Sequence, residues 1–334
     1  MQRRVSAIVT AAVGAGVSLV FIAAAAGQTG DLAKGASLLA DARKAIGGED
    51  KLAAIKRLQV NGTMRRGQGN INLDGDSEVF FELPDKFRRN ESLSLGVGGP
   101  GIDRVEVLNG NDVWDETSGG GGGGRGADFG GRGGRGGNFG GGGGGGRGIG
   151  DLLGAARGDA AGQGGQQIDP ERLREAQRRA RHTEVVRLLL AILLKTDAPA
   201  AWIGTAQSPD GTADVLEVSS PDGVTTRLLL DSATHMPLML TWPGAAQRAG
   251  GGRAEQGRGR NPAGAPDQAQ RRGGRGAQGG PPSTIEMHLA EFKAVNGIKL
   301  PHLITRGTSG ETSEEWEIKN YKVNPNFKAN TFTK

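Results

Sequence analysis

The sequence has 334 residues, of which 61 are glycine, 4% are aromatic and none is cysteine. This composition excludes a disulfide framework and a thiolate metal site, and it indicates that much of the chain cannot join a packed core. The formal charge of +5 comes from the N-terminus and two glycine-rich tracts, so the rest of the chain is slightly acidic and the excess charge is not typical of its folded surface.

Residues 1–28 have the organisation of a secretory signal peptide. Arg3 and Arg4 precede an apolar run from Val5 to Ala26, and small residues end this run before Gly27-Gln28. We therefore expect cleavage and export to the periplasm. The alternative is an uncleaved inner-membrane anchor, because about 22 apolar residues would also span a bilayer.

Removing the leader and the two tracts leaves roughly 215 residues, which one sheet-based domain can organise around a single apolar core. We therefore expect one domain over residues 29–334. Apolar residues at helical spacing predict a helix over 32–46, which Gly47-Gly48 ends. A short helical segment follows at 49–56 and leads into the first strand.

Alternating apolar and polar residues then predict strands through most of the remaining chain. Asx-Gly pairs separate the runs, which is the sequence signal for antiparallel hairpins. The fold class predicted is mainly β with helices, an antiparallel meander of about ten strands. The separating pairs are Asp74-Gly75, Asn109-Gly110, Asp210-Gly211, Asp222-Gly223 and Asn296-Gly297.

One longer helix is predicted between the two halves of this sheet. Asp169 is its N-cap, Pro170 stands at the first helical position, and Lys195 lies in the last turn. Arginines crowd its first half, whereas residues 188–194 are apolar on every side and must be covered on every side. The helix is therefore either a core helix packed on the sheet or a lid across a hydrophobic cavity, and both place it on the concave face.

Residues 119–168 and 244–282 are too rich in glycine, arginine and polar residues to order themselves, and we expect both to be disordered insertions in surface loops. Their arginines are candidates for contact with anionic membranes or polymers. A nucleic-acid partner is not expected for an exported chain, although Arg-Gly repeats are typical of such binding. The candidate residues are Arg125, Arg132, Arg135, Arg147, Arg258, Arg260, Arg271 and Arg272.

Groups that could carry catalysis do not converge in the sequence. The four histidines are scattered without metal-ligand spacing, and no nucleophile elbow is present. The glycine runs match a dinucleotide fingerprint only through their abundance, without a surrounding βαβ unit. We therefore expect no enzyme, no cofactor and no metal.

Four segments together resemble the outer-membrane lipoprotein-sorting family, the LolA/LolB-like fold shared with the regulator RseB. The segments are ADARKAIGGEDKLAAIKRLQVNGT, FELPDKFRRN, LNGNDVWDE and KVNPNFKANTFTK, in this order along the chain. The resemblance covers residues 31–334 outside the insertions. In the carrier branch an arginine precedes the proline of the second-to-third strand turn and helps to control opening, but here Leu83 precedes Pro84.

The resemblance implies an unclosed β-barrel of about eleven antiparallel strands, with helices over its concave face and a cavity that shields lipoprotein acyl chains. We therefore expect a monomeric periplasmic carrier of a lipid or lipoprotein acyl chain, without covalent chemistry. The alternative is an RseB-like envelope sensor or scaffold, whose sheet encloses an ordinary filled core and whose loops bind a protein or anionic polymer. The implied concave-face residues are Val79, Phe81, Leu83, Phe87 and Trp114, covered by Leu189, Ile192 and Leu193.

Overall fold

The structure is a computed structural model. The predicted leader, nearly all of both predicted insertions and the eight arginines assigned to polyanion contact lie outside the residues that it describes. Those residues are 30–68, 71–96, 99, 101–119, 169–220, 223–244 and 283–334.

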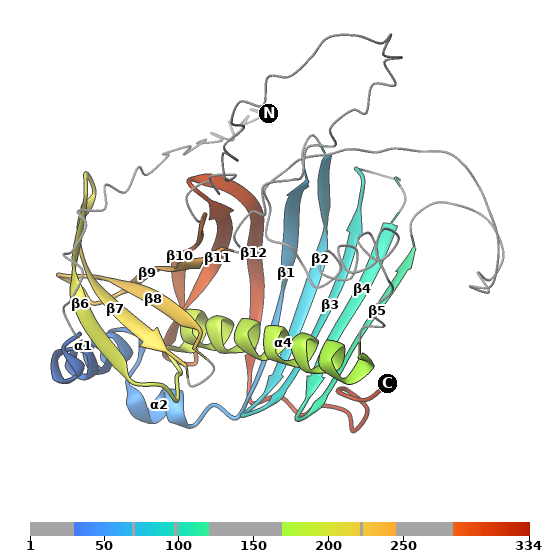
Figure 1. Cartoon of the computed structure of the whole chain (residues 1–334), viewed down its shortest axis with the longest axis horizontal. Coiled ribbons are helices and arrows are strands. Elements are labelled where there is room, and N and C mark those ends of the chain that lie inside the picture. The colour runs from blue at the N-terminus through green and yellow to red at the C-terminus, as the bar shows by residue number, and fades with distance from the viewer. Residues whose placement is uncertain are drawn as a thin grey trace, which may run out of the picture.

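Two helices precede the sheet in the sequence, as predicted. Helix α1 (Leu32–Ile46) begins at Asp31, whose side chain caps the helix, and ends at Gly47, where a positive φ of 154° suits glycine. Helix α2 (Glu49–Ala53) follows at once and buries its single leucine. Both helices pack at one end of the sheet (Figure 1).

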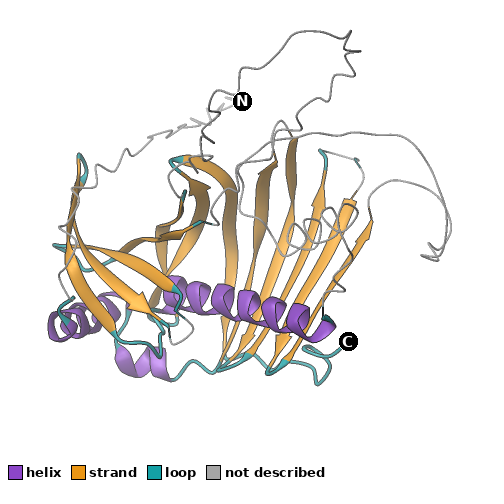
Figure 2. Ribbon diagram, viewed as in Figure 1, coloured by secondary structure: helices purple, strands orange, loops and turns teal. Residues whose placement is uncertain are grey.

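All twelve described strands belong to one antiparallel sheet, which curves and stays open (Figures 1 and 2). The count slightly exceeds the ten or eleven strands expected. The strands are β1 (Arg57–Gln68), β2 (Ile71–Glu82), β3 (Lys86–Ser94), β4 (Gly101–Asn109), β5 (Asp112–Gly119), β6 (Ala200–Ser208), β7 (Gly211–Ser219), β8 (Thr225–Asp231), β9 (Pro237–Pro243), β10 (Thr284–Val295), β11 (Ile298–Thr308) and β12 (Glu311–Val323).

The strand order differs from that of a single meander. It runs β5-β4-β3-β2-β1-β12-β11-β10-β9-β8-β7-β6, so two meanders join where the first strand pairs with the last. The edges of the sheet are therefore β5 and β6, although these two strands follow one another in the sequence. The chain between them contains the long helix α4 (Pro170–Leu193), which crosses one face of the sheet (Figure 1).

Three of the predicted turns lie between paired strands, at Asn109-Gly110, Asp210-Gly211 and Asn296-Gly297. The turn predicted at Asp74-Gly75 is wrong, because both residues lie within β2 and pair with β1 and β3. A Cβ atom at Gly75 would stand 1.8 Å from the carbonyl oxygen of Ser92. Glycine is needed here because β3 passes close to β2.

The face covered by α4 is called the inner face, and it carries the main apolar core. Because directly paired residues share a face, the register assigns side chains from every strand of the middle of the sheet to it. The long helix supplies its C-terminal half to the same core. Buried inner-face residues include Leu58, Val60, Met64, Val79, Phe81, Phe87, Leu108, Leu216, Leu228, Leu240, Leu289, Leu300 and Ile304.

The opposite, outer face is covered in part by the C-terminal segment 324–334. The ring of Phe327 packs edge-on against Phe80 of β2 and against Phe332. Arg88 of β3 donates to the carbonyl oxygen of Thr331 at 2.9 Å. These contacts bury Phe332 to 6% exposure, so the last residues belong to the fold.

Within the part of the chain that the structure describes, no helix has the length and apolar character required to cross a membrane.

Candidate functional site

Helix α4 is the element that organises the inner face. Its N-cap Asp169 accepts a hydrogen bond of 2.9 Å from the amide of Glu171, and Pro170 fills the first helical position, as predicted. The helix ends at Leu194, whose φ of 51° is left-handed. Lys195 therefore lies beyond the last turn.

The C-terminal end of α4 is fixed by two side chains to α1 and to the residues between α2 and β1. Arg43 of α1 donates through Nε to the carbonyl oxygen of Leu194 at 3.1 Å. Lys195 donates through Nζ to the carbonyl oxygen of Ile55 at 3.0 Å. Both cations lie where the helix dipole is negative, so this end of α4 is capped and held.

Seven of the eight residues predicted for the concave face meet in the main core. Six are buried, and Leu83 packs partly buried against the same cluster. The phenylalanines of β2 and β3 are paired across the two strands, with ring centroids 5.4 Å apart. The six buried residues are Val79, Phe81, Phe87, Leu189, Ile192 and Leu193.

Trp114 departs from the predicted set. It pairs with Val107 of β4, which pairs in turn with Arg88 of β3, and these three residues lie on the outer face. Its neighbour Val113 pairs with Leu108 and faces inward instead. Alternation and the resemblance together had placed Trp114 inside, and a shift of one residue in a strand reverses the face.

The inner face is filled where the predicted residues meet. Val79, Phe81, Phe87 and Leu193 are each 0% exposed, so protein side chains occupy the space that a ligand would take. A ligand at this site would therefore have to replace part of the packing. The element positioned to give way is α4, because it is the layer that covers these strands (Figure 1).

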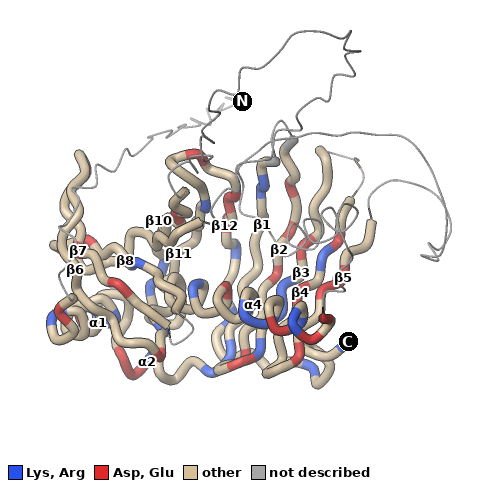
Figure 3. The backbone as a smooth tube through the Cα atoms, in the orientation of Figure 1, with Lys and Arg blue, Asp and Glu red and all other residues tan. Residues whose placement is uncertain are grey.

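The N-terminal half of α4 rests on charged residues. Figure 3 shows basic and acidic residues gathered where this half crosses β3, β4 and β5. The side chain of Arg181 is only 1% exposed and contacts Glu106 of β4 and Asp115 of β5. Its Nη2 atom lies 2.8 Å from Oδ1 of Asp115.

A second group of ion pairs extends this network along the inner face. Arg89 of β3 donates to Glu184 of α4 at 2.6 Å, and Arg66 of β1 contacts both Glu91 and Glu314 at 3.1 Å. We call the whole group the inner charge cluster. Its members are Arg66, Arg89, Arg104, Arg181, Glu91, Glu106, Asp115, Glu184 and Glu314.

The cluster shifts the ionisation of its acids in two directions. Burial opposes ionisation of Glu184, but the charges of Arg89 and Arg181 outweigh burial and lower its pKa to about 2. The pKa of Glu314 is also lowered, because Arg306 and Arg66 outweigh its burial. Burial raises the pKa of Asp115 in spite of Arg181. The cluster joins α4 to the sheet through these ion pairs.

Sequence reasoning missed the inner charge cluster, although β3 contains its signal. Phe87, Arg89, Glu91 and Leu93 alternate on one face and are all buried. Charged residues at the apolar positions of an alternating strand indicate buried ion pairs when an oppositely charged partner exists. Glu314 belongs to this buried cluster and not to a solvated edge, because β12 lies in the middle of the sheet.

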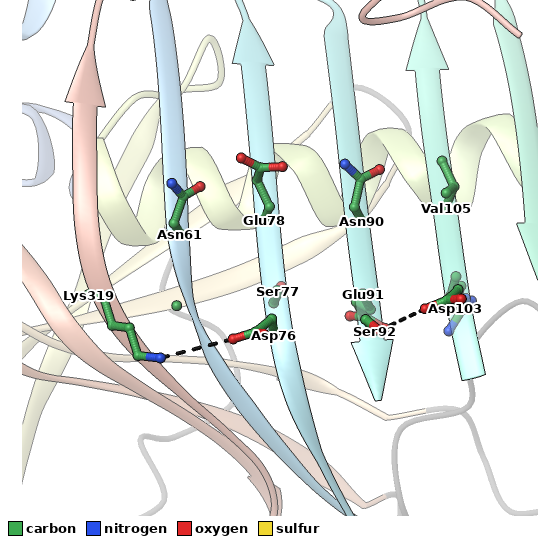
Figure 4. A pocket seen from close by; sticks show the side chains of 12 residues that line it. Asn61, Asp76, Ser77, Glu78, Asn90, Glu91, Ser92, Asp103, Val105 and Lys319 are labelled. Carbon is green, nitrogen blue, oxygen red and sulfur yellow. Dashed lines mark hydrogen bonds and ion pairs between the residues drawn. The ribbon is translucent and has the colours of Figure 1, made fainter. Parts of the chain in front are cut away.

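The outer face has a shallow open pocket of about 430 Å³ over β1 to β4 (Figure 4). Its polar side chains already contact one another. Lys319 lies 4.0 Å from Asp76, and Ser92 donates to Asp103 at 2.7 Å. No group of three or more potential metal ligands occurs among the described residues, here or elsewhere. The pocket therefore does not offer a built site.

Comparisons with known proteins give structural neighbours only. No family model and no curated protein sequence matches the chain. Among solved structures, the chain is similar to a LolA superfamily protein from Nitrosomonas europaea, with 12% identity, a TM-score of 0.42, and 90% of this chain and 97% of that chain covered.

Two further solved structures have the same degree of similarity. One is a domain assigned to the outer membrane lipoprotein-sorting proteins, from Vibrio parahaemolyticus, with 10% identity, a TM-score of 0.40, and 91% and 97% of the two chains covered. The other is a DUF1329 family protein from Desulfovibrio piger, with 7% identity, a TM-score of 0.40, and 89% and 96% covered. The first two names are those of the family that the sequence resembles.

Proposed function

We propose that this chain is an exported binding module that holds an acyl chain between α4 and the inner face of the sheet, without covalent chemistry. The observation that carries the proposal is the division of α4 into two halves. Its residues from 188 onward are apolar on every side, and the part before them is held by ion pairs at Arg181 and Glu184. One mobile element can therefore cover and uncover a continuous apolar surface.

The energetics favour a lipid chain as the occupant. Each methylene group taken out of water contributes roughly 0.8 kcal/mol, so a ligand of acyl length can replace the contacts that α4 gives up. While the site is empty, the ion pairs favour the state in which α4 lies on the sheet. Moving α4 away would separate its charged side chains from their partners on the strands. Arg43 and Lys195 hold the C-terminal end of α4 near Leu194, so the N-terminal half of this helix is the part that moves.

The first test of this proposal uses the unmodified protein. The mature chain is purified, extracted with organic solvent, and the extract is analysed for lipids by mass spectrometry. Recovery of stoichiometric acyl lipid supports a carrier. Extracts without lipid, together with no binding of the neutral fluorophore N-phenyl-1-naphthylamine, contradict it.

A second test locks α4 on the sheet. Because the chain has no cysteine, Arg181→Cys with Asp115→Cys gives the only thiols, and a bis-methanethiosulfonate linker joins α4 to β5 reversibly. We expect the linked protein to exclude the fluorophore and the reduced protein to bind it. Glu217→Cys with Arg227→Cys is the matched control, since it links two strands through an exposed ion pair. Equal binding by the linked and reduced forms contradicts the role of α4.

The filled inner face also favours a second candidate function. A core with side chains at 0% exposure is what an envelope sensor or scaffold would have, with partners bound elsewhere. For this candidate the locked protein keeps its function, and no lipid is recovered. The two tests above therefore separate the candidates.

A further inference from the structure

Two arginines lie beside the inner charge cluster and have no ion pair with a carboxylate among the described residues. Arg187 of α4 donates through Nε to Oγ1 of Thr226 at 3.2 Å, and its guanidinium carbon lies 4.4 Å from the ring centroid of Trp242. Arg306 of β11 lies 5.8 Å from the same centroid. Its Nε atom is buried and has no hydrogen-bond partner among the described residues.

The carboxylates nearest to these arginines already have other partners. Glu184 is bound by Arg89 and by Arg181. Glu314 pairs with Arg306 in the sheet register. Its Oε2 atom, however, accepts hydrogen bonds from both Nε and Nη2 of Arg66. Among the described residues, neither Arg187 nor Arg306 has a carboxylate oxygen within ion-pairing distance.

The protein therefore holds two like charges on one indole ring. Burial, followed by the charge of Arg306, lowers the pKa of Arg187 to about 10, which records the cost of this arrangement. Buried guanidinium groups are normally paired with anions. The inner face, with six arginines against five carboxylates in this region, has one positive charge that the described chain does not balance.

The unpaired arginines also lie next to the apolar part of the site. Arg187 directly precedes the buried run 188–194, and Trp242 belongs to the main core. A molecule with an anionic head and an apolar chain would satisfy both surfaces at once. A free anion would satisfy only the first.

We propose that Arg187 and Arg306 bind the phosphate or carboxylate head group of an anionic amphiphile whose acyl chain lies under α4. This inference rests on the proposed function and names the class of its ligand. The ring of Trp242 makes cation-π contacts with both guanidinium groups. The head group of the ligand supplies the negative charge that these two groups lack.

The test compares ligands that share one acyl chain. Myristoyl lysophosphatidic acid and monomyristoylglycerol differ in the phosphate. The affinity of each is measured by its displacement of bound N-phenyl-1-naphthylamine, at ligand concentrations below the critical micelle concentration. We expect the phosphate-bearing ligand to bind roughly ten- to hundredfold more tightly, because a charge-assisted hydrogen bond discriminates by this amount. Arg187→Gln and Arg306→Gln should remove the preference, because they weaken binding of the phosphate-bearing ligand more than binding of monomyristoylglycerol.

Two controls protect the interpretation. Arg227→Gln removes an arginine from the outer face of β8 and should keep the preference. Arg187→Lys keeps the charge and should restore part of it, which distinguishes head-group binding from a loss of folding.

The outcomes separate this inference from the proposed function. Equal affinity of the wild-type protein for both ligands overturns the head-group site and leaves the carrier proposal standing. Binding of neither ligand overturns the carrier proposal itself. If millimolar inorganic phosphate alone raises the thermal midpoint as much as lysophosphatidic acid does, the ligand is a free anion and the amphiphile is wrong.

Discussion

Glu184 of α4 accepts a hydrogen bond of 2.6 Å from Arg89 of β3, and this contact joins the middle of the helix to the inner face of the sheet. Glu184 also faces Arg181, one turn earlier on the same helix. The helix is thus held by charge in its first half and by apolar packing in its second. Each attachment can be weakened separately, which makes the arrangement testable.

Arg181→Ala should destabilise the protein by about 3–5 kcal/mol, because it removes this partner from the buried Glu106 and from the partly exposed Asp115. Urea unfolding at neutral pH measures the effect. Arg179→Ala is the matched control on the same helix, since that side chain is 67% exposed, and it should change stability by less than about 0.5 kcal/mol. Equal effects of the two substitutions would show that the buried network does not hold α4.

The pH dependence of stability follows from the shifted acids. The folded pKa of Glu184 is about 2, below its ordinary value, so its stabilising contribution is complete above about pH 4.5 and is lost as the pH falls toward 2. Glu314 acts in the same direction. Asp115, whose pKa is raised, acts in the opposite direction and favours the folded state when protonated. We therefore expect the thermal midpoint to fall as the pH is lowered through this window.

Glu184→Gln isolates the contribution of one acid to this slope. The variant should be less stable than wild type at pH 7, and its thermal midpoint should depend less on pH between about 5 and 2. Glu116→Gln alters an exposed residue on the outer face of β5 and serves as the control. A slope in Glu184→Gln as steep as that of wild type would contradict the assignment.

Leu193→Ala should cost about 2–5 kcal/mol, because the side chain is 0% exposed in the main core and its loss leaves a cavity. Leu238→Ala is the control, since Leu238 of β9 is 40% exposed. The same cavity should change the affinity for N-phenyl-1-naphthylamine if the apolar half of α4 faces the ligand. Unchanged affinity with reduced stability would assign Leu193 to the core alone.

Replacing residues 245–282 by Asn-Gly should preserve the fold. Pro243 and Thr284 are paired across β9 and β10, and the amide of Gly244 donates to the carbonyl oxygen of Ser283 at 2.7 Å, so a two-residue turn can join the strands. Shortening a long connection also lowers its closure entropy. Circular dichroism and a cooperative thermal transition are the measurements, and loss of cooperativity would show that these residues are part of the domain.

Asn324→Ala should destabilise the protein by about 2 kcal/mol. The Asn324 side chain accepts from the amides of Lys56 and Arg57 and donates to the carbonyl oxygen of Ala54, joining the end of β12 to the start of β1. Asn330→Ala is the control, because only its backbone carbonyl makes hydrogen bonds among the described residues. Equal stability of the two variants would show that Asn324 does not hold the end of β12 to the start of β1.

Much of the fold could be predicted from local patterns. The N-cap Asp169, the glycine stop at Gly47 and three of the Asx-Gly turns are determined by neighbouring residues, and all are found as predicted. The apolar run of α4 also predicted burial on every side, and Leu188 to Leu194 are all buried. These signals are local, so a single sequence contains them.

The remaining features depend on which strands meet. The pairing of β1 with β12 placed Glu314 beside Arg66, and no local pattern indicates that two segments so far apart are neighbours. The face of Trp114 depends on a one-residue register that alternation in an exposed edge strand does not fix. The arginines at Arg187 and Arg306 come together only when α4 lies across β11.

The pairing of the first strand with the last has a kinetic consequence. Leu58 and Val323 are partners, so the centre of the sheet forms only after nearly the whole chain has been made. Contacts between residues so far apart in the sequence lose much conformational entropy before the contact stabilises the chain, and this makes folding slow. Until β12 arrives, the two meanders present unpaired edges to each other and to any neighbouring chain. A chaperone that shields these edges during biogenesis would therefore raise the yield of native protein.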